Sequence, residues 1–348
     1  MTKTIAIFRT GGIGDVILST VSINIIKDTL PLAKIIWFGR EPSNSLIKNI
    51  FRDVEVFEIS SKNSYLQNLQ LIKNSTGKID AIIDLQHSAR TIILGRLTAL
   101  RNGCHYTSWN KYSIERSLLV IQSYLRGRTF NFDFLKKELP NRFEAMSDCT
   151  KKALLKIQTH PKDNKNYTPS FATLSATKAN DTVTICLGAK FLTKALPLTK
   201  VENIVQLLLL NSSVKNIIFI GEENQRKNAD DLVKRFYSAV NFHNLCGATT
   251  LTEAANILSK SKFAIVNDSG LAHLSEAVNT PVITFFGPTH QKFGYRPFLN
   301  NSRTLSVELG CRPCNKNGNV KCRYKDHACS SLIDQTHLVS LISEMADA

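Results

Sequence analysis

The feature of this sequence that most constrains its fold is an alternation of short apolar runs with longer amphipathic stretches, which occurs twice. In the first half, strands are predicted at residues 4–8, 35–38, 54–59 and 81–85, and helices at 15–30 and 88–100. This order of strand and helix is typical of a parallel sheet with helices on both faces.

The alternation stops in the middle of the chain and then restarts. Residues from about 110 to 153 carry many charges and are predicted to be helical. Residues 160–182 contain Pro161 and Pro169 but have no core pattern, so we expect an interdomain linker there. In the second half, strands are predicted at 183–187, 216–220, 263–266 and 282–286, and helices at 201–210, 224–236, 252–259, 271–278 and 332–345.

The two similar halves predict an α/β protein with two Rossmann-like domains that face a central cleft. A chain of 348 residues is also longer than a single core usually supports. We assign residues 1–165 to the first domain and 182–330 to the second. A last helix in 331–348 could pack back onto the first domain.

The chain has a formal charge of +16, which favours an anionic partner such as nucleic acid, an acidic membrane surface or a phosphorylated substrate. The charge could equally serve solubility alone. The apolar run near the N-terminus is broken by Arg9 and is too short for a signal peptide. No stretch is long enough for a membrane span, so we expect a cytoplasmic protein that can touch the inner membrane from inside.

The first motif is Arg9-Thr10-Gly11-Gly12-Ile13-Gly14-Asp15, between the first predicted strand and helix. Glycines there allow a tight turn and the close approach of a ligand. Asp15 follows the carboxyl end of a strand, where open α/β sheets bind their ligands. Taken alone, Asp15 is more simply a helix cap.

Two further motifs follow strand ends in the second half. Gly188 and Lys194 come after the first strand of this half, where a lysine can neutralise a diphosphate. The simpler alternative is that Lys190 and Lys194 are two ordinary surface lysines. The string 268–273 reads Asp-Ser-Gly-Leu-Ala-His, and a helix start of this kind exposes amides that bind anions. The simpler alternative is N-capping by Asp268 or Ser269, with His273 buried in the core.

Together with Phe286-Gly287-Pro288-Thr289, these motifs resemble the ADP-heptose:lipopolysaccharide heptosyltransferases, glycosyltransferase family 9, nearly from end to end. The resemblance implies a GT-B fold, with the nucleotide-sugar donor in the C-terminal domain and the acceptor in the N-terminal domain. It implies inverting transfer of heptose from ADP-heptose to an anionic acceptor in the lipopolysaccharide inner core.

The resemblance also assigns residues. Asp15 matches the catalytic carboxylate, and Lys194 matches the lysine that holds the donor phosphates. The implied donor-binding residues are Gly188, Lys194, Glu222, Asp268, Ser269, Gly270 and His273. The implied acceptor-binding residues are Gly14, His87 and Arg90. Leu196 stands where many members have tryptophan, and the spacing around Glu222 is loose.

An inverting transfer needs a base on the acceptor hydroxyl and stabilisation of the leaving diphosphate. We expect Asp15 to take the proton, and Lys194 with the helix start after Asp268 to hold the leaving group. The sequence has no Asp-x-Asp pair that would bind Mg²⁺, so no cofactor is expected for catalysis.

Four of the eight cysteines cluster near the C-terminus, at Cys311, Cys314, Cys322 and Cys329. In a cytosolic chain this cluster favours a structural zinc or iron site with four thiolates over disulfides. Free or paired cysteines in an irregular loop remain the alternative.

Two alternatives to the heptosyltransferase remain. One is a GT-B transferase that uses another nucleotide sugar or a protein acceptor, which a comparison of ADP with UDP binding would separate. The other is a basic RNA-binding module, but the chain lacks RNP-type aromatic motifs and its cations are spread over both halves. We therefore expect no nucleic-acid partner.

Overall fold

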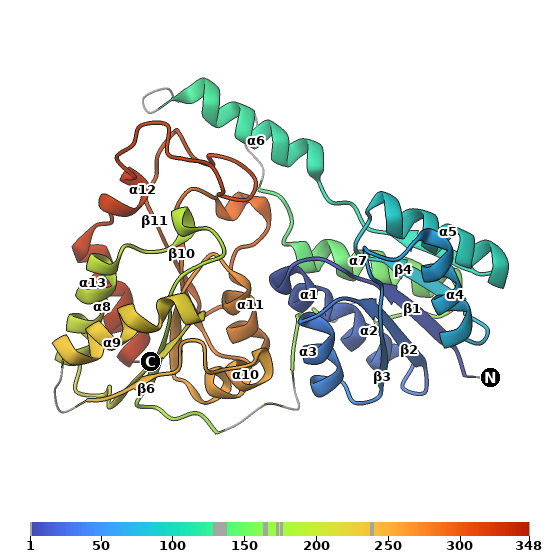
Figure 1. Cartoon of the computed structure of the whole chain (residues 1–348), viewed down its shortest axis with the longest axis horizontal. Helices are drawn as coiled ribbons and strands as arrows, with labels where there is room; N and C mark the ends of the chain where they lie inside the picture. The colour runs from blue at the N-terminus through green and yellow to red at the C-terminus, as the bar shows by residue number, and fades with distance from the viewer. Residues whose placement is uncertain are drawn as a thin grey trace. The chain divides into compact units, whose positions relative to one another are not determined.

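The computed structural model describes residues 2–127, 138–162, 166–171, 174, 177–236 and 240–347. The chain forms two compact units (Figure 1). Unit 1 comprises Met1–Lys111 and Pro140–Thr173, and unit 2 comprises Tyr112–Leu139 and Leu174–Ala348. Two expectations are thereby corrected: the segment from Tyr112 to Leu139 and the last helix both belong to unit 2.

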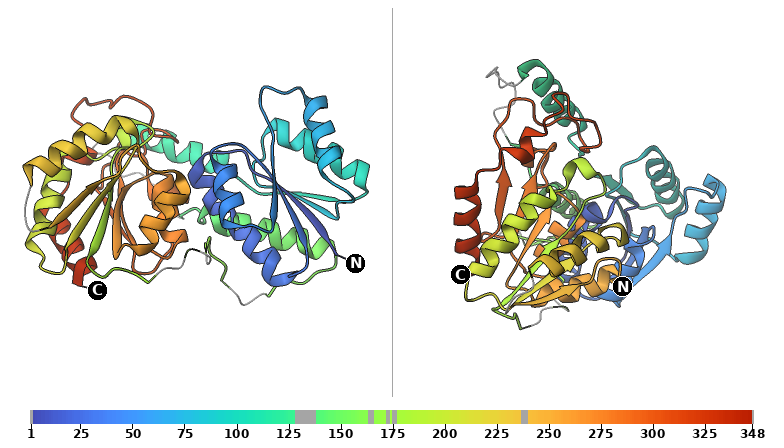
Figure 2. Two further views of the ribbon diagram at one scale, coloured as in Figure 1. Left: turned by 60° about the horizontal axis from the view of Figure 1, so that its bottom comes forward. Right: turned by 60° about the vertical axis from the view of Figure 1, so that its left-hand side comes forward.

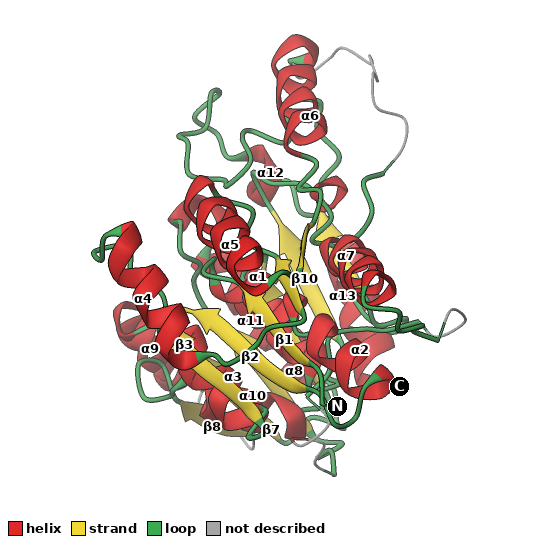
Figure 3. Cartoon of the chain, turned by 90° about the vertical axis from the view of Figure 1, so that its right-hand side faces the viewer, coloured by secondary structure: helices red, strands yellow, loops and turns green. Residues whose placement is uncertain are grey.

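Unit 1 contains one five-stranded sheet with all neighbouring strands parallel, in the order β3-β2-β1-β4-β5 (Figure 3). Its strands are β1 Thr4–Phe8, β2 Lys34–Gly39, β3 Val54–Glu58, β4 Ala81–Asp84 and β5 His105–Ser108. Its helices are α1 Ile13–Ser19, α2 Val21–Thr29, α3 Ser43–Ile50, α4 Tyr65–Ser75, α5 Ala89–Asn102 and α7 Arg142–Lys156.

The predicted strands of the first half are confirmed, whereas β5 was missed and the helix expected at 15–30 is two helices. The break lies at Thr20, the residue between α1 and α2. The hydroxyls of Ser19 and Thr20 donate to the carbonyls of Val16 and Ile17, at 2.6 and 2.7 Å. Such back-bonding competes with the helical ladder and bends helices.

Unit 2 contains a six-stranded parallel sheet in the order β11-β10-β9-β6-β7-β8 (Figure 2, left). Its strands are β6 Thr182–Cys186, β7 Asn216–Ile220, β8 Asn241–Asn244, β9 Phe263–Asn267, β10 Val282–Phe286 and β11 Arg303–Ser306. Its helices are α6 Ser113–Arg126, α8 Leu198–Leu210, α9 Arg226–Arg235, α10 Leu251–Lys260, α11 Gly270–Ala277, α12 Ala328–Ser331 and α13 Gln335–Asp347, with short turns at η2 Leu192–Lys194, η3 Glu223–Gln225 and η4 Gln291–Phe293.

Each sheet is the centre of its own hydrophobic core. In unit 1 the core joins β1, β2 and β4 through side chains such as Phe8, Phe38 and Ile82. In unit 2 it includes Leu338, Ile342 and other residues of α13, which packs beside α8. The expectation that the last helix packs onto the first domain is wrong because these apolar side chains complete the core of unit 2.

Both sheets reverse their strand order at one place. In unit 1 the chain leaves β1 towards β2 and β3 on one side and then crosses to β4 and β5 on the other. In unit 2 it leaves β6 towards β7 and β8, and then crosses to β9, β10 and β11. The loops that follow the two central strands diverge at such a switch point, which leaves a crevice for a ligand. The switch points lie between β1 and β4 and between β6 and β9.

Among the helices that the structure describes, none is both long and apolar enough to span a bilayer.

A buried acid fastens one loop of unit 2. The Oε1 atom of Glu276 on α11 accepts hydrogen bonds from the amides of Phe298 and Leu299, both at 2.8 Å, and from the Ser302 hydroxyl at 2.9 Å. Burial raises the pKa of this carboxyl to about 7, although the three hydrogen bonds oppose the shift. The neutral acid is therefore the form that the fold favours.

Glu276→Gln should remove a pH dependence of stability. The folded-state pKa of about 7 lies above the ordinary 4.5, so the folded chain binds one more proton between these values. Stability should fall as pH rises through that window, by on the order of 3 kcal/mol in the wild type. The glutamine keeps the accepting oxygen, so the variant should lose this slope in urea unfolding measured from pH 4.5 to 7. Equal slopes in both proteins would contradict the assignment.

Candidate functional site

The switch point of unit 1 holds an acid between two arginines. Asp15 lies in the first turn of α1, and Gly12 occupies the N-cap position, so Asp15 is not the capping residue. Its Oδ2 lies 2.9 Å from Nη2 of Arg9 in an ion pair, and its Oδ1 accepts a hydrogen bond from Nε of Arg142 at 3.0 Å. Both guanidinium groups are buried, whereas the carboxylate is 24 % exposed. The acid is thus oriented from two sides and is still reachable.

An aromatic ring and a third cation complete this surrounding. The buried indole of Trp109 lies 4.6 Å from the Arg142 guanidinium and 5.7 Å from that of Arg9. Burial lowers the pKa of Lys111, and the charges of Arg9 and Arg142 lower it further, while Asp15 opposes them. Three cations thus surround Asp15 at the switch point of unit 1, with Asp84 at the end of β4 as a second nearby acid. An excess of cations suits an anionic substrate.

The loop after β4 lies at the same switch point. The Gln86 side chain accepts from the amide of Thr10 at 3.2 Å, which ties this loop to the glycine-rich loop after β1. His87 adopts φ = 47°, and its Nδ1 donates to the Trp109 carbonyl at 2.8 Å. Left-handed backbone at such a residue is costly and is often found at functional sites.

The other two predicted acceptor residues differ in their surroundings. Gly14 lies in the first turn of α1, next to Asp15. The Arg90 guanidinium donates to the carbonyl of Asn63 at 2.8 Å and stacks on the Tyr65 ring at 4.8 Å. Arg90 thereby fastens the loop before α4, and its role towards an acceptor stays a prediction.

The switch point of unit 2 holds the converse arrangement, a lysine on an acid. The Lys194 ammonium lies 2.7 Å from Oδ2 of Asp268, which also accepts from the Thr289 hydroxyl at 2.6 Å. Lys194 ends η2 after β6, Asp268 follows β9, and Thr289 follows β10. Three loops at adjacent strand ends thus converge on one ion pair, and sequence reasoning had not assigned Thr289 to it.

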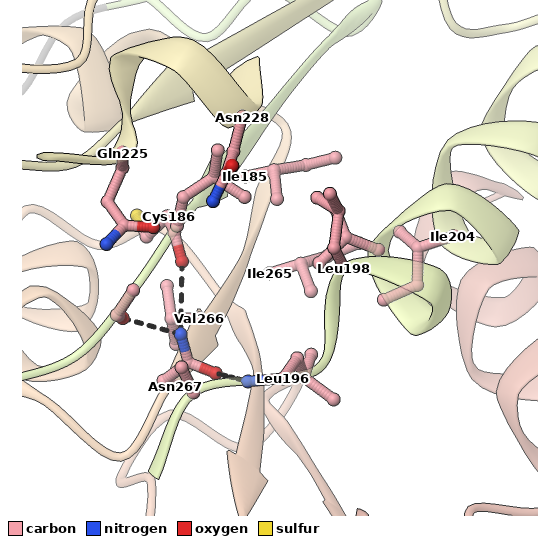
Figure 4. Close-up of a pocket in the computed structure, with 14 residues that line it drawn as sticks. Ile185, Cys186, Leu196, Leu198, Ile204, Gln225, Asn228, Ile265, Val266 and Asn267 are labelled. Carbon is pink, nitrogen blue, oxygen red and sulfur yellow. Dashed lines mark hydrogen bonds between the residues drawn. The ribbon is translucent and has the colours of Figure 1, made fainter. Parts of the chain in front are cut away.

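A strand-end asparagine ties the same loops together (Figure 4). The Asn267 amide donates to the carbonyl of Gly188 at 2.6 Å, and its oxygen accepts from the Leu196 amide at 3.0 Å. A small pocket lies beside it, lined by apolar side chains that include Leu196 and Ile204 and by Gln225 at its edge. The Gly188 backbone has φ = 72°, and an added Cβ would lie 2.9 Å from the Gln225 side chain.

The N-terminus of α11 lies beside Asp268, the acid that pairs with Lys194. Ser269 is its N-cap residue but makes no side-chain capping hydrogen bond, and Gly270 opens the helix. His273 is buried with its ring 5.9 Å from that of Tyr295. Glu222 is exposed at the end of β7. The helix start can bind an anion, whereas the predicted contacts of His273 and Glu222 with a donor stay predictions.

The four clustered cysteines do not form the predicted metal site. All four are free thiols, and within the described ranges no three His, Cys, Asp or Glu side chains converge in a way that could hold a metal ion. The Cys314 thiol faces the Cys311 carbonyl at 3.8 Å, and the Cys322 thiol faces the Asp326 carboxylate at 3.9 Å. Burial raises the pKa of Cys314 to about 11, and the nearby thiols of Cys311, Cys329 and Cys322 raise it further. The described side chains as arranged therefore form no metal site.

Instead, the cysteine-rich loop, residues 310–330, braces the lysine site, which we define as Lys194 with Asp268 and Thr289. The buried guanidinium of Arg312 donates to the carbonyls of Phe286 and Thr289, and the Cys314 amide donates to the Pro288 carbonyl at 2.7 Å. The Thr193 hydroxyl donates to the Gly318 carbonyl. Gly318 has φ = 75°, and a Cβ there would lie 2.8 Å from Cγ of Lys194. The loop thus fixes the position of the Lys194 side chain.

Sequence reasoning missed the arginines at Asp15 and the brace at Lys194. Arg9 carried one signal, a charge directly after an apolar strand in a motif that had been singled out. Arg142 carried none, since it lies 127 residues from Asp15 and opens a helix of its own.

The fold defines a class. The structure of E. coli heptosyltransferase WaaC with ADP superposes with a TM-score of 0.69 and 18 % identity, over 98 % of this chain and 99 % of that one. The iron-containing dodecameric glycosyltransferase TibC of enterotoxigenic E. coli is more distant, with a TM-score of 0.54 and 12 % identity, over 99 % of this chain and 76 % of that one. These likenesses show the fold: the two doubly wound units have the GT-B arrangement.

The sequence comparisons define the family. Residues 74–325 match the model of glycosyltransferase family 9 (heptosyltransferase). Lipopolysaccharide heptosyltransferase 1 of Campylobacter coli is 25 % identical over 360 residues, which cover 98 % of each chain. The chain therefore belongs to glycosyltransferase family 9, the heptosyltransferases.

Gly318→Ala changes a residue of the cysteine-rich loop and should displace the Lys194 side chain that packs against it. The added methyl group would press on the Lys194 side chain, so under the function proposed below ADP binding should be about tenfold weaker in calorimetry, a loss of about 1.4 kcal/mol. Gly103→Ala is the matched control, because Gly103 has a similar φ of 61° but open space around its Cβ. Equal ADP affinity in the two variants would contradict the bracing role of the loop.

Proposed function

We propose that this protein transfers heptose from ADP-heptose to a lipopolysaccharide inner-core acceptor, with inversion at the anomeric carbon and without a catalytic metal ion. The observation that carries the proposal is the Lys194–Asp268–Thr289 arrangement beside the N-terminus of α11, at the switch point of unit 2. A lysine and exposed helix amides there suit a diphosphate. The relatives supply the identity of the sugar and nucleotide: they are heptosyltransferases, and one was solved with ADP.

The lysine site would stabilise the leaving group. As the glycosidic bond to the diphosphate breaks, negative charge grows on the phosphate oxygens. The Lys194 ammonium is already oriented by Asp268 and braced by Gly318, so little reorganisation is needed when that charge develops. The amides at the start of α11 supply further positive potential. These groups can together take the place of Mg²⁺.

The acid in unit 1 would serve as the base. Asp15 accepts the proton of the acceptor hydroxyl while that oxygen attacks the anomeric carbon from the face opposite the leaving diphosphate. Its two arginines hold the carboxylate in place from two sides. An acceptor that carries its own anionic groups would compete for Arg142 and Arg9 and so free the carboxylate as it binds. The base would thereby become active when the acceptor is present.

Asp15→Asn should retain the fold and ADP affinity but lower turnover by about 10²-fold or more, because the amide cannot take the proton. The measurement is transfer from ADP-heptose to a truncated lipopolysaccharide, followed by product mass spectrometry. Asp53→Asn is the control, since Asp53 is an exposed acid paired with Lys27. Near-normal turnover in the Asp15 variant would show that the carboxylate only orients the arginines.

Lys194→Ala should weaken ADP binding in calorimetry by about tenfold or more, since the diphosphate loses its main side-chain cation. Lys190→Ala is the control because Lys190 is exposed on the same loop. EDTA should leave transfer unchanged in the wild type. Unchanged ADP affinity in the Lys194 variant, or loss of transfer with EDTA, would refute this part of the proposal.

The remaining assignments follow from the substrates. A lipopolysaccharide acceptor carries acyl chains, so the protein would work as a peripheral protein at the cytoplasmic face of the inner membrane. The same machinery would serve another nucleotide sugar or a protein acceptor. Tighter binding of UDP than of ADP, or a glycosylated protein as the only product, would favour that alternative.

A further inference from the structure

The helix α6 of unit 2 is seated on the cysteine-rich loop by polar contacts (Figures 1 and 2). The Lys316 ammonium donates to the Ser113 carbonyl at 3.0 Å, near the start of the helix. Towards its end, the Ser123 hydroxyl donates to the Pro313 carbonyl at 2.6 Å, and the Arg323 guanidinium donates to the Ser123 carbonyl at 3.1 Å. Leu119 adds an apolar contact with Phe293. One face of the helix is thereby fixed.

The opposite face of α6 is apolar and exposed. Its side chains range in exposure from 42 % for Leu118 to 75 % for Ile114. Four of them, Ile114, Leu118, Ile121 and Leu125, recur at intervals of three or four residues, and Tyr124 lies beside them, so the set forms one stripe along the helix. The stripe consists of Ile114, Leu118, Ile121, Tyr124 and Leu125. Five large apolar side chains in one stripe need an apolar environment.

Cations border this stripe on the loop side. The Arg323 guanidinium lies 4.1 Å from the centre of the Tyr124 ring, and Tyr324 next to it is 41 % exposed. Lys321 and Lys325 are exposed on the same loop. Loop 310–330 carries five cations against one acid, Asp326. Arg312 is buried, so the cations available at its surface are Lys316, Lys321, Arg323 and Lys325. The stripe thus has a positively charged edge with two tyrosines on it.

We propose that the apolar stripe of α6 and the cations of loop 310–330 form a binding surface for an anionic lipid bilayer. An interfacial helix buries its apolar face among the acyl chains while basic residues at its edge meet anionic headgroups. Tyrosines are suited to the boundary between the two. A second copy of the chain is the poorer occupant, because each copy carries a charge of +16 and would bring the same cations to the contact. This surface goes beyond the proposed transfer reaction and does not depend on it.

Co-sedimentation with vesicles tests the proposal. The wild type should pellet with vesicles of phosphatidylcholine and phosphatidylglycerol in equal parts, and far less with phosphatidylcholine alone. The double variant L118Q/I121Q should bind the anionic vesicles at least about tenfold more weakly, because two apolar side chains no longer gain from burial. L32Q/L210Q is the matched control, since both leucines are exposed but lie outside α6. K321Q/K325Q should weaken binding and reduce its dependence on salt.

Three results would overturn the proposal: no binding of the wild type to anionic vesicles, equal binding of L118Q/I121Q, or a wild-type dimer in sedimentation velocity that this variant abolishes. Melting temperature and ADP affinity check that the variant is folded. Transfer to an acceptor dispersed in detergent should be normal in the variant. A wild type that binds vesicles but transfers no heptose would refute the proposed function and leave this surface intact.

Discussion

The constraint on which the rest of the structure depends is the reversal of strand order in each parallel sheet. It separates the loops after β1 and β4 in unit 1 and those after β6 and β9 in unit 2. Side chains then bridge each gap: Gln86 reaches Thr10 in unit 1, and Asn267 reaches Gly188 and Leu196 in unit 2. These hydrogen bonds tie the loops at each switch point together, so the charged groups on the loops are already positioned.

The functional side chain at each switch point is already part of an ion pair. Asp15 is held by two arginines, and Lys194 by Asp268. A partly buried charge without a partner would be costly, so these pairs stabilise the two sites. In the proposed function, an incoming anion would share Lys194 with Asp268 or compete with Asp15 for its arginines. The same contacts would then serve both stability and recognition.

The cysteine-rich loop is the element whose role changed most. Its spacing predicted a metal centre, but the structure uses the loop as a brace. Arg312 fastens it to the end of β10, Gly318 packs on Lys194, and Arg323 holds α6. These contacts come from backbone carbonyls and from a glycine, which no cysteine pattern encodes. One irregular segment therefore connects the lysine site with the apolar helix within unit 2.

The sequence by itself determined the two parallel sheets and the places of Asp15, Lys194 and Asp268, because strand-helix alternation and strand-end motifs depend on neighbours along the chain. Only the tertiary structure decided that Arg142 pairs with Asp15, that Thr289 joins Asp268, and that α6 and α13 belong to unit 2. These outcomes depend on contacts between residues far apart in sequence, and burial of apolar faces selects among such contacts without leaving a local pattern. The four cysteines show the same limit, since spacing places thiols near one another but does not orient them.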